Sequence, residues 1–159
     1  MSEPTPLYFD DFHVGRRFTS RGITLTEAGI IDFAYKYDPQ PFHIDKTAAD
    51  DSQFGGLIAS GFHTLAAAFR MIIQENIFTA CSMGSPGLDA LRWRQPVYPG
   101  DTLKVTMEVT DAAPSSSRPD RGRIRAAYTV TNQHGDAVLT FTAMQIMKRH
   151  PDLAGTAGT

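Results

Sequence analysis

The residues in this sequence best suited to chemistry are a carboxylate and an imidazole, Asp38 and His43, that stand close together in an acidic segment. Two prolines, Pro39 and Pro41, fix φ within this segment and bias the residues before them toward extended backbone. A segment stiffened in this way suits two polar side chains that must keep a set separation. A carboxylate and an imidazole that share a water can exchange protons with it, so the pair indicates general acid–base catalysis.

The second candidate for chemistry is a helix start that follows this pair along the chain. From Gly61 to Phe78 apolar residues recur at helical spacing, and this is the strongest helical pattern in the sequence. The first N–H groups of a helix have no partners within it and lie at the positive end of its dipole. The Gly61 N–H is therefore expected to stabilise negative charge that develops on an oxygen, and glycine leaves room for an approaching substrate. Together with the pair, this helix start suits chemistry on a carbonyl compound.

Each of these residues also has an ordinary structural interpretation. Asp38 fits a turn residue at the end of a helix that satisfies nearby backbone, and His43 fits a hydrogen-bonded loop histidine. His63 is interpreted as a packing or surface residue rather than part of an acyl pocket. A metal site built from His43, Asp45 and His63 is rejected, because their spacing matches no ligand motif. No cofactor is expected.

The composition limits the class of protein. A chain of 159 residues with 42% hydrophobic residues fits one globular domain, and a net charge of -2 argues against nucleic acid as the main partner. The single cysteine, Cys81, excludes an internal disulfide framework and a cysteine-based zinc cluster. No signal-peptide pattern opens the sequence, and no apolar run is long enough to cross a membrane. We expect a cytoplasmic protein.

The pattern predicts helices and strands in a definite order. A helix begins at Thr24, in a capping box with Glu27, or at Thr26 alone, and ends before Pro39. A single further turn is predicted over Lys46 to Asp50. The predicted strands cover Arg16 to Ile23, Leu88 to Val97, Thr102 to Asp111, Arg123 to Gln133 and Ala137 to Lys148.

One antiparallel sheet wrapped around a long central helix satisfies this order, which is an α+β architecture. The helix from Gly61 is expected to be enclosed, because its apolar residues cover more than half of its circumference. Residues 1–150 are predicted to form a single domain, which begins with a loose arm at 1–6 and contains a mobile loop at 114–122. A disordered tail is predicted at 151–159. The exposed edges of such a sheet favour pairing into a homodimer or higher homo-oligomer.

Three patches resemble the MaoC-like dehydratases, which include the R-specific enoyl-CoA hydratases with a hotdog fold. The segment DPQPFH, from Asp38 to His43, is similar to the family pattern Gly-Asp-x-Asn-Pro-hydrophobic-His. The run FGGLIASG, which ends at Gly61, resembles the family's approach to its central helix. The run LRWRQPVYPGD resembles the strand and turn after that helix. The similarity covers roughly the span from Phe12 to Lys148.

Two residues depart from the family pattern. Tyr37 stands where the family has Gly, and Gln40 stands where it has Asn. Glutamine keeps the amide but adds a methylene, so its hydrogen bonds must reach differently. A tyrosine beside Asp38 is expected to narrow the pocket or to move the loop. Both changes bear on the substrate rather than on the fold.

The resemblance implies reversible addition of water to a 2-enoyl thioester of CoA or of an acyl-carrier protein, giving a 3-hydroxyacyl thioester of R configuration. Asp38 and His43 would be the acid–base pair, and the Gly61 N–H the oxyanion donor. The substrate-binding residues would be Gln40, Ser60, Phe62 and Leu65. Four arginines, at positions 118, 121, 123 and 125, are interpreted as a solvated hairpin rather than as a phosphate site. The aromatic residues Trp93, Phe69 and Phe141 are expected in the core.

Two other functions remain open. A hotdog thioesterase typically carries a carboxylate on the central helix, but Gly61 to Ile73 contains no Asp or Glu and Glu75 lies late. A non-catalytic acyl-CoA-binding hotdog protein would need the fold and the start of the helix, but neither Asp38 nor His43. Replacing both residues separates these classes, because a binding protein would keep its ligand affinity.

Overall fold

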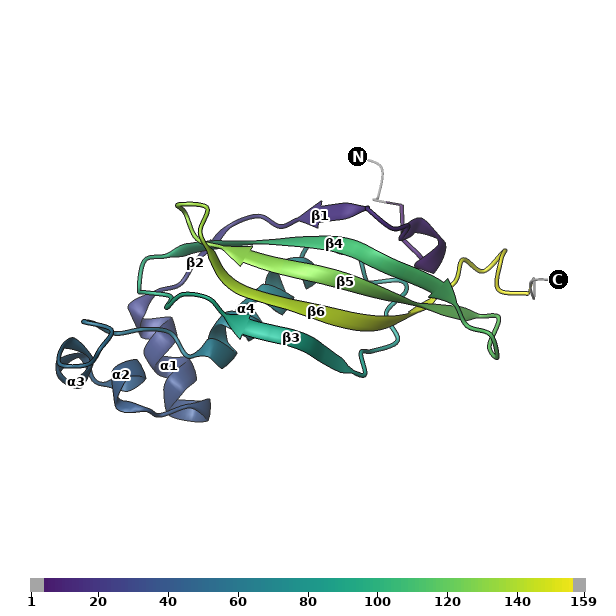
Figure 1. The fold of residues 1–159 in the computed structure, drawn as a ribbon. Helices are drawn as coiled ribbons and strands as arrows, with labels where there is room; N and C mark the ends of the chain where they lie inside the picture. Colours follow the sequence, from purple (N-terminus) through teal and green to yellow (C-terminus); the bar gives the residue numbers. More distant parts are fainter. Residues whose placement is uncertain (1–4, 156–159) are drawn as a thin grey trace.

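The computed structural model describes residues 5–155, and they form one curved antiparallel sheet with helices on one side (Figure 1). The strand order is β1-β4-β5-β6-β3, and the short strand β2 also pairs with β4. The strands are β1 (Arg17–Thr19), β2 (Ile23–Thr24), β3 (Gly87–Trp93), β4 (Thr102–Pro114), β5 (Arg121–Thr131) and β6 (Ala137–Lys148). The predicted antiparallel sheet is confirmed.

The helices gather on the inner face and at one end of the sheet (Figure 1). They are α1 (Glu27–Tyr37), α2 (Pro41–Ile44), α3 (Lys46–Asp50) and α4 (Gly61–Ile73), preceded by one 3₁₀ turn, Phe9–Asp11. The Thr26 hydroxyl accepts a hydrogen bond from the Gly29 N–H at 3.0 Å and caps α1. The capping box between Thr24 and Glu27 is therefore wrong, whereas the turn predicted over Lys46 to Asp50 is confirmed.

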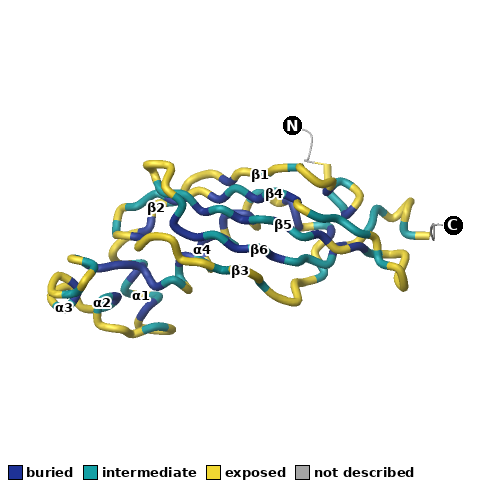
Figure 2. Tube along the Cα trace, viewed as in Figure 1, coloured by how far each residue is buried: buried dark blue, intermediate teal, exposed yellow. Residues whose placement is uncertain are grey.

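Alternation along the strands buries one face of the sheet. On β5 every second residue from Gly122 to Val130 is buried, and β4 shows the same alternation from Leu103 to Val109. These side chains pack with the buried residues of α4 in one core, and Figure 2 shows buried residues along this helix and along the middle strands. The largest fully buried side chains include Tyr128, Met71, Ile72, Leu103, Met107, Ile124 and Leu139.

Several element boundaries differ from the prediction. The strand predicted over Arg16 to Ile23 is interrupted at Ser20. There the Ser20 N–H donates to the Val105 carbonyl on β4, but the Val105 N–H donates to the Ser20 side chain instead of to a backbone carbonyl. The central helix ends at Ile73 rather than Phe78, and a turn with positive φ at Asn76 follows it. The strands β4 and β5 also extend into the predicted loop, which shortens the connection to 115–120.

The central helix is covered on one side only. Its buried residues are Thr64, Ala67, Ala68, Met71 and Ile72, whereas Phe62 and Ile73 are exposed. The prediction that the helix is enclosed is therefore wrong for the single chain. The loose arm and the tail lie partly outside the described residues, at 1–4 and 156–159, and the tail residues 151–155 form a turn.

Candidate active site

The carboxylate of Asp38 and the imidazole of His43 face each other. Asp38 is the residue at which α1 ends, and His43 lies in the four-residue helix α2 rather than in a loop. The distance between His43 Nε2 and Asp38 Oδ2 is 3.3 Å. Both side chains are largely withdrawn from solvent, since that of His43 is 5% exposed and that of Asp38 15%. The spacing in the sequence thus brings the predicted pair into contact.

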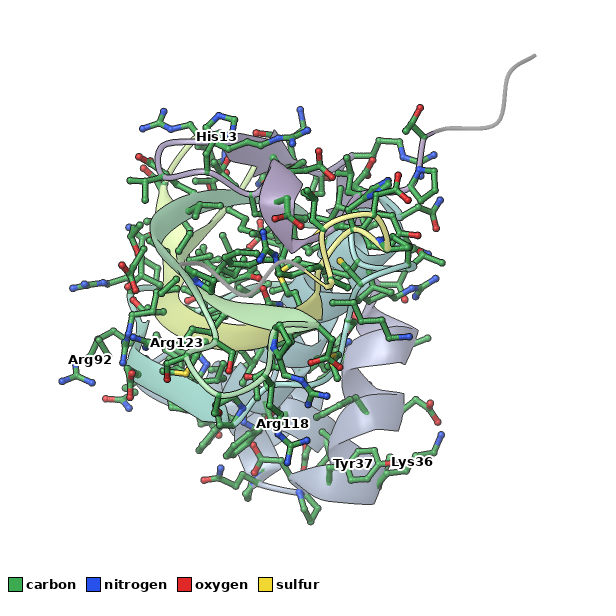
Figure 3. The ribbon with its side chains drawn as sticks, turned by 90° about the vertical axis from the view of Figure 1, so that its right-hand side faces the viewer. His13, Lys36, Tyr37, Arg92, Arg118 and Arg123 are labelled. Atoms are coloured by element: carbon green, nitrogen blue, oxygen red, sulfur yellow. The ribbon has the colours of Figure 1, made fainter. Side chains whose placement is uncertain are left out.

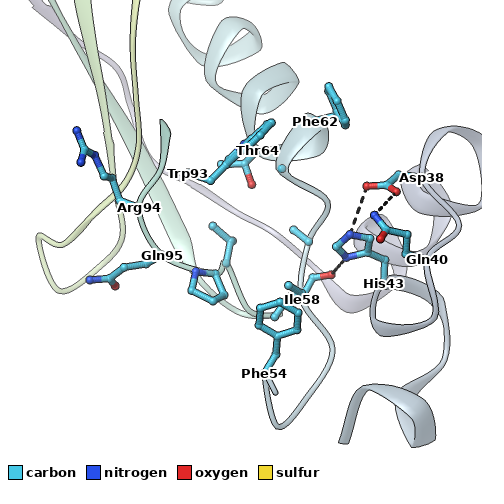
Figure 4. A pocket seen from close by; sticks show the side chains of 14 residues that line it. Asp38, Gln40, His43, Phe54, Ile58, Phe62, Thr64, Trp93, Arg94 and Gln95 are labelled. Atoms are coloured by element: carbon cyan, nitrogen blue, oxygen red, sulfur yellow. Dashed lines mark hydrogen bonds and ion pairs between the residues drawn. The ribbon is translucent and has the colours of Figure 1, made fainter. Parts of the chain in front are cut away.

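The other ring nitrogen of His43 is bound to the backbone. Nδ1 lies 2.7 Å from the carbonyl oxygen of Ile58. Because a carbonyl oxygen only accepts hydrogen bonds, Nδ1 must carry the proton of the neutral ring. Nε2 is then the atom that takes up or releases a proton, and it is the atom turned toward Asp38 (Figure 4).

Three side chains contact the Asp38 carboxylate. Ser60 Oγ donates to Oδ2 at 2.7 Å, and Gln40 Nε2 donates to Oδ1 at 2.8 Å. Burial raises the pKa of Asp38. The hydrogen bonds from Ser60 and Gln40 and the charge of His43 lower it, and together they outweigh burial, so the pKa lies below its usual range. Asp38 is therefore ionised at neutral pH.

Short backbone links hold the segments that carry these residues. The Ile58 N–H bonds to the carbonyl of Phe42 at 3.2 Å, and the Ala59 N–H bonds to the carbonyl of Val97 at 2.8 Å. The segment that leads into α4 is thereby tied to α2 on one side and to the chain after β3 on the other. Ser60 then caps α4, because its hydroxyl accepts from the Phe62 N–H at 3.2 Å.

Beside the pair lies a cavity of about 350 Å³. Figure 4 shows Asp38, Gln40 and His43 on one side of this pocket, with Trp93 and Thr64 across from them. The lining residues are Asp38, Gln40, His43, Phe54, Ile58, Ala59, Gly61, Phe62, Thr64 and the run from Trp93 to Val97.

The structure brings together most of the residues predicted for the site. Gln40, Gly61 and Phe62 line the cavity with the pair. Ser60 is fully buried and contacts Asp38 rather than the cavity. Leu65 packs against the core and is not among the lining residues.

Trp93 is the main residue that the sequence reasoning missed. It was expected in the core, but it is 49% exposed and lines the cavity. On β3 it pairs with Leu139, which is fully buried, so its side chain lies on the inner face of the sheet. A Cβ on Gly61 would overlap the indole. Gly61 is thus required by the packing of Trp93, not only by an approaching substrate.

The start of α4 offers a hydrogen-bond donor to the cavity. The Gly61 N–H has no acceptor among the residues that the structure describes, because Ser60 Oγ caps Phe62 instead. Gly61 is the first residue of a thirteen-residue helix, so this N–H lies at the positive end of the helix dipole. An oxygen that gains negative charge in the cavity would be stabilised there.

The remaining candidates lie outside the cavity. Tyr37 projects into solvent from the end of α1 (Figure 3). It does not line the cavity, so the expectation that it narrows the pocket is wrong, whereas an effect on the position of the loop stays a prediction. His63 stacks on Phe33 with ring centroids 4.7 Å apart, which confirms the packing interpretation. No group of three or more metal-ligating side chains occurs within residues 5–155.

The predicted arginines are also remote from this cavity. Arg121 pairs with Asp120 at 2.9 Å, and Arg125 pairs with Asp89 at 2.9 Å. Arg118 and Arg123 extend outward (Figure 3). The arginine that does line the cavity is Arg94, whose Nε donates to Thr140 at 3.1 Å.

Comparison with known proteins identifies the family of the chain. The model of the MaoC-like domain family matches residues 11–133. The chain belongs to this family. The MaoC-like dehydratase from Rhodospirillum rubrum is 39% identical, with a TM-score of 0.84 over 91% of this chain and 99% of that one. The R-hydratase PhaJ1 from Pseudomonas aeruginosa is 27% identical, with a TM-score of 0.75 over 97% of this chain and 96% of that one.

The fold is that of the hotdog proteins, as predicted. A Mycobacterium tuberculosis protein with a double hotdog fold matches 96% of this MaoC-like chain and 47% of its own length, with a TM-score of 0.78 at 22% identity. At that identity the likeness shows the fold alone. Membership of the family and the likeness to an R-hydratase support hydratase or dehydratase chemistry in general. Among the described residues, no helix is long and apolar enough to span a membrane.

Proposed function

We propose that this MaoC-like protein adds water reversibly to a 2-enoyl thioester and forms a 3-hydroxyacyl thioester. The observation that carries the proposal is the 3.3 Å contact between His43 Nε2 and Asp38 Oδ2. The contact lies beside an apolar cavity that the first residues of α4 also line. The reaction needs three things, namely an activated water, a proton for Cα and stabilisation of the thioester oxygen. The cavity offers a group for each.

The water would be bound on the cavity side of the pair, within reach of both His43 Nε2 and Asp38 Oδ2, because the 3.3 Å between these two atoms leaves no room for a water between them. In the neutral ring Nε2 is an acceptor, and the Asp38 carboxylate accepts as well, so one water can donate a hydrogen to each. As the water oxygen bonds to Cβ, the pair accepts one proton from the water and returns one to Cα. Because Nδ1 stays bound to Ile58, every proton transfer at His43 passes through Nε2.

The thioester oxygen would face the Gly61 N–H. Addition at Cβ moves electrons toward this oxygen until Cα is protonated. A donor at the positive end of α4 lowers the energy of that enolate-like state. The acyl chain would lie along the apolar wall formed by Phe54, Ile58, Phe62 and Trp93.

The thioester carrier is proposed to be CoA or an acyl-carrier protein, and no further cofactor is proposed. The configuration proposed for the product is R, because the Pseudomonas relative is named an R-hydratase. The protein is proposed to act as a homodimer in the cytoplasm, and the exposed apolar face of α4 supports the dimer.

The thioesterase alternative would need a carboxylate of the central helix in the cavity, and the candidate, Glu75, is not there. Glu75 lies beyond the end of α4, where its carboxylate accepts hydrogen bonds from the backbone and side chain of Arg21 at 3.0 and 3.3 Å. It does not line the cavity. A binding protein without turnover is the alternative that the first experiment must exclude.

The first experiment follows the enoyl-thioester absorbance band with crotonyl-CoA and with a longer enoyl-CoA. Wild type is expected to bleach the band, and Asp38→Asn to lose about a hundredfold or more in rate, the usual contribution of general acid–base catalysis. The matched control is Asp32→Asn, an exposed residue of α1 whose carboxylate pairs with Lys36. If wild type binds enoyl-CoA without turnover, the protein is a binding module. Equal rates in wild type and Asp38→Asn contradict the site.

A further inference from the structure

Gln40 contacts both members of the proposed acid–base pair. Its side-chain Nε2 donates to Asp38 Oδ1 at 2.8 Å. Its backbone N–H donates to the carbonyl of Asp38 at 2.8 Å, and its own carbonyl accepts from the His43 N–H at 2.9 Å. The residue between the two prolines is thus linked to the carboxylate, to the backbone of Asp38 and to the backbone of His43.

We infer that Gln40 is a positioning residue, whose amide fixes the Asp38 carboxylate in the orientation that turns Oδ2 toward His43 Nε2. This differs from the substrate-binding role that the sequence suggests. The inference rests on the proposed function, because it concerns the pair assigned there.

The need for such a residue follows from the freedom of a carboxylate. The terminal torsion of aspartate is broad, so the carboxylate plane is held only by its hydrogen bonds. Ser60 and His43 both contact Oδ2, whereas Gln40 is the only side chain among the described residues that contacts Oδ1. Without Gln40 the carboxylate keeps both contacts on one oxygen and can rotate about them.

The local backbone directs the amide toward Asp38. Gln40 lies in the extended region, with φ -70° and ψ 144°, and Pro41 begins α2 directly after it. Pro39 and Pro41 leave this backbone little freedom. The bond fixes the orientation of the amide, since only its nitrogen can donate to a carboxylate.

The bond also has a consequence for the charge on Asp38. Burial raises the pKa of Asp38, and hydrogen bonds from Ser60 and then Gln40 lower it. Losing the Gln40 bond would raise the pKa. Activity that needs the carboxylate is present above this pKa and is lost as the pH falls through it. The acid limb of the activity profile would therefore move to higher pH in a variant without the amide.

The test compares Gln40→Leu, which removes the donor at nearly constant size, with Gln40→Asn, which keeps an amide. Both are measured for kcat, for KM and for the pH dependence of hydration of crotonyl-CoA. We expect kcat of the Leu variant to fall about tenfold, the size typical for losing one hydrogen bond to a charged group, with KM nearly unchanged and the acid limb moved up. The Asn variant should lie nearer to wild type. Gln53→Leu, in the exposed loop before Phe54, is the matched control.

A second readout does not depend on turnover. The pKa of Asp38, followed by NMR of its carboxyl carbon, should rise in Gln40→Leu. If wild type shows no hydration but this pKa rises, the proposed function fails and the positioning role stands. A raised KM with unchanged kcat and unchanged acid limb would make Gln40 a substrate-binding residue. An Asp38 pKa equal in wild type and in Gln40→Leu would overturn the inference.

Discussion

At the scale of single residues, the packing of the Trp93 indole against Gly61 predicts that the start of α4 does not tolerate a larger side chain. A Cβ at position 61 would overlap the indole. We expect Gly61→Ala to displace the indole or to shift the first turn of α4. The substitution should lower the unfolding free energy by about 1–3 kcal/mol, as at other overpacked sites. Hydration should fall with it, because the Gly61 N–H would move.

The double variant Gly61→Ala/Trp93→Ala separates the clash from the backbone role. Removing the indole relieves the overlap, so the unfolding free energy of the double variant should exceed that of Gly61→Ala alone. Urea unfolding of wild type, both single variants and the double variant measures this coupling. Additive effects of the two substitutions would contradict the packing described here.

At the scale of elements, the cap of α1 is a prediction of its own. The Thr26 hydroxyl accepts the Gly29 N–H, so Thr26→Ala is expected to cost about 1 kcal/mol of unfolding free energy, which urea unfolding can measure. Thr24→Ala is the control, because Thr24 bonds instead to the Thr102 hydroxyl on the exposed face of β4. Its effect should stay within about 0.5 kcal/mol, as for other surface changes. A larger loss of unfolding free energy for Thr24→Ala than for Thr26→Ala would indicate that Thr24, and not Thr26, caps α1.

The elements show how far the sequence determines the fold and the site. Periodicity and capping residues are local signals, and they predicted α1, the start of α4 at Gly61 and the exact bounds of β6. The spacing of Asp38 and His43 predicted two polar side chains at a set separation, because two prolines restrict the backbone between them, and the structure shows the two side chains in contact. Trp93 was placed wrongly, because an alternating strand does not reveal how completely its neighbours cover each residue. The hydrogen bond from Gln40 to Asp38 depends on a side-chain direction that spacing alone does not give.

At the scale of the whole molecule, the uncovered face of α4 is the feature that supports the proposed homodimer. Phe62 and Ile73, which are both apolar, are 59% and 52% exposed. Phe62 also meets Trp93 edge to face, with centroids 5.7 Å apart, at the wall of the cavity. On its side away from β6, β3 pairs with no other described strand. A second copy of the chain that covers α4 would also complete this wall, so assembly and activity should be linked.

Ile73→Lys tests this link without touching the cavity. If α4 is buried between two copies, a charge at position 73 should convert a dimer into a monomer in sedimentation velocity, and hydration should fall because Phe62 and Trp93 lose their cover. Val14→Lys, at an exposed apolar residue in the turn before β1, is the control and should leave a dimer. A monomeric wild type that still hydrates enoyl-CoA would show that one copy suffices. The exposed face of α4 would then need another explanation.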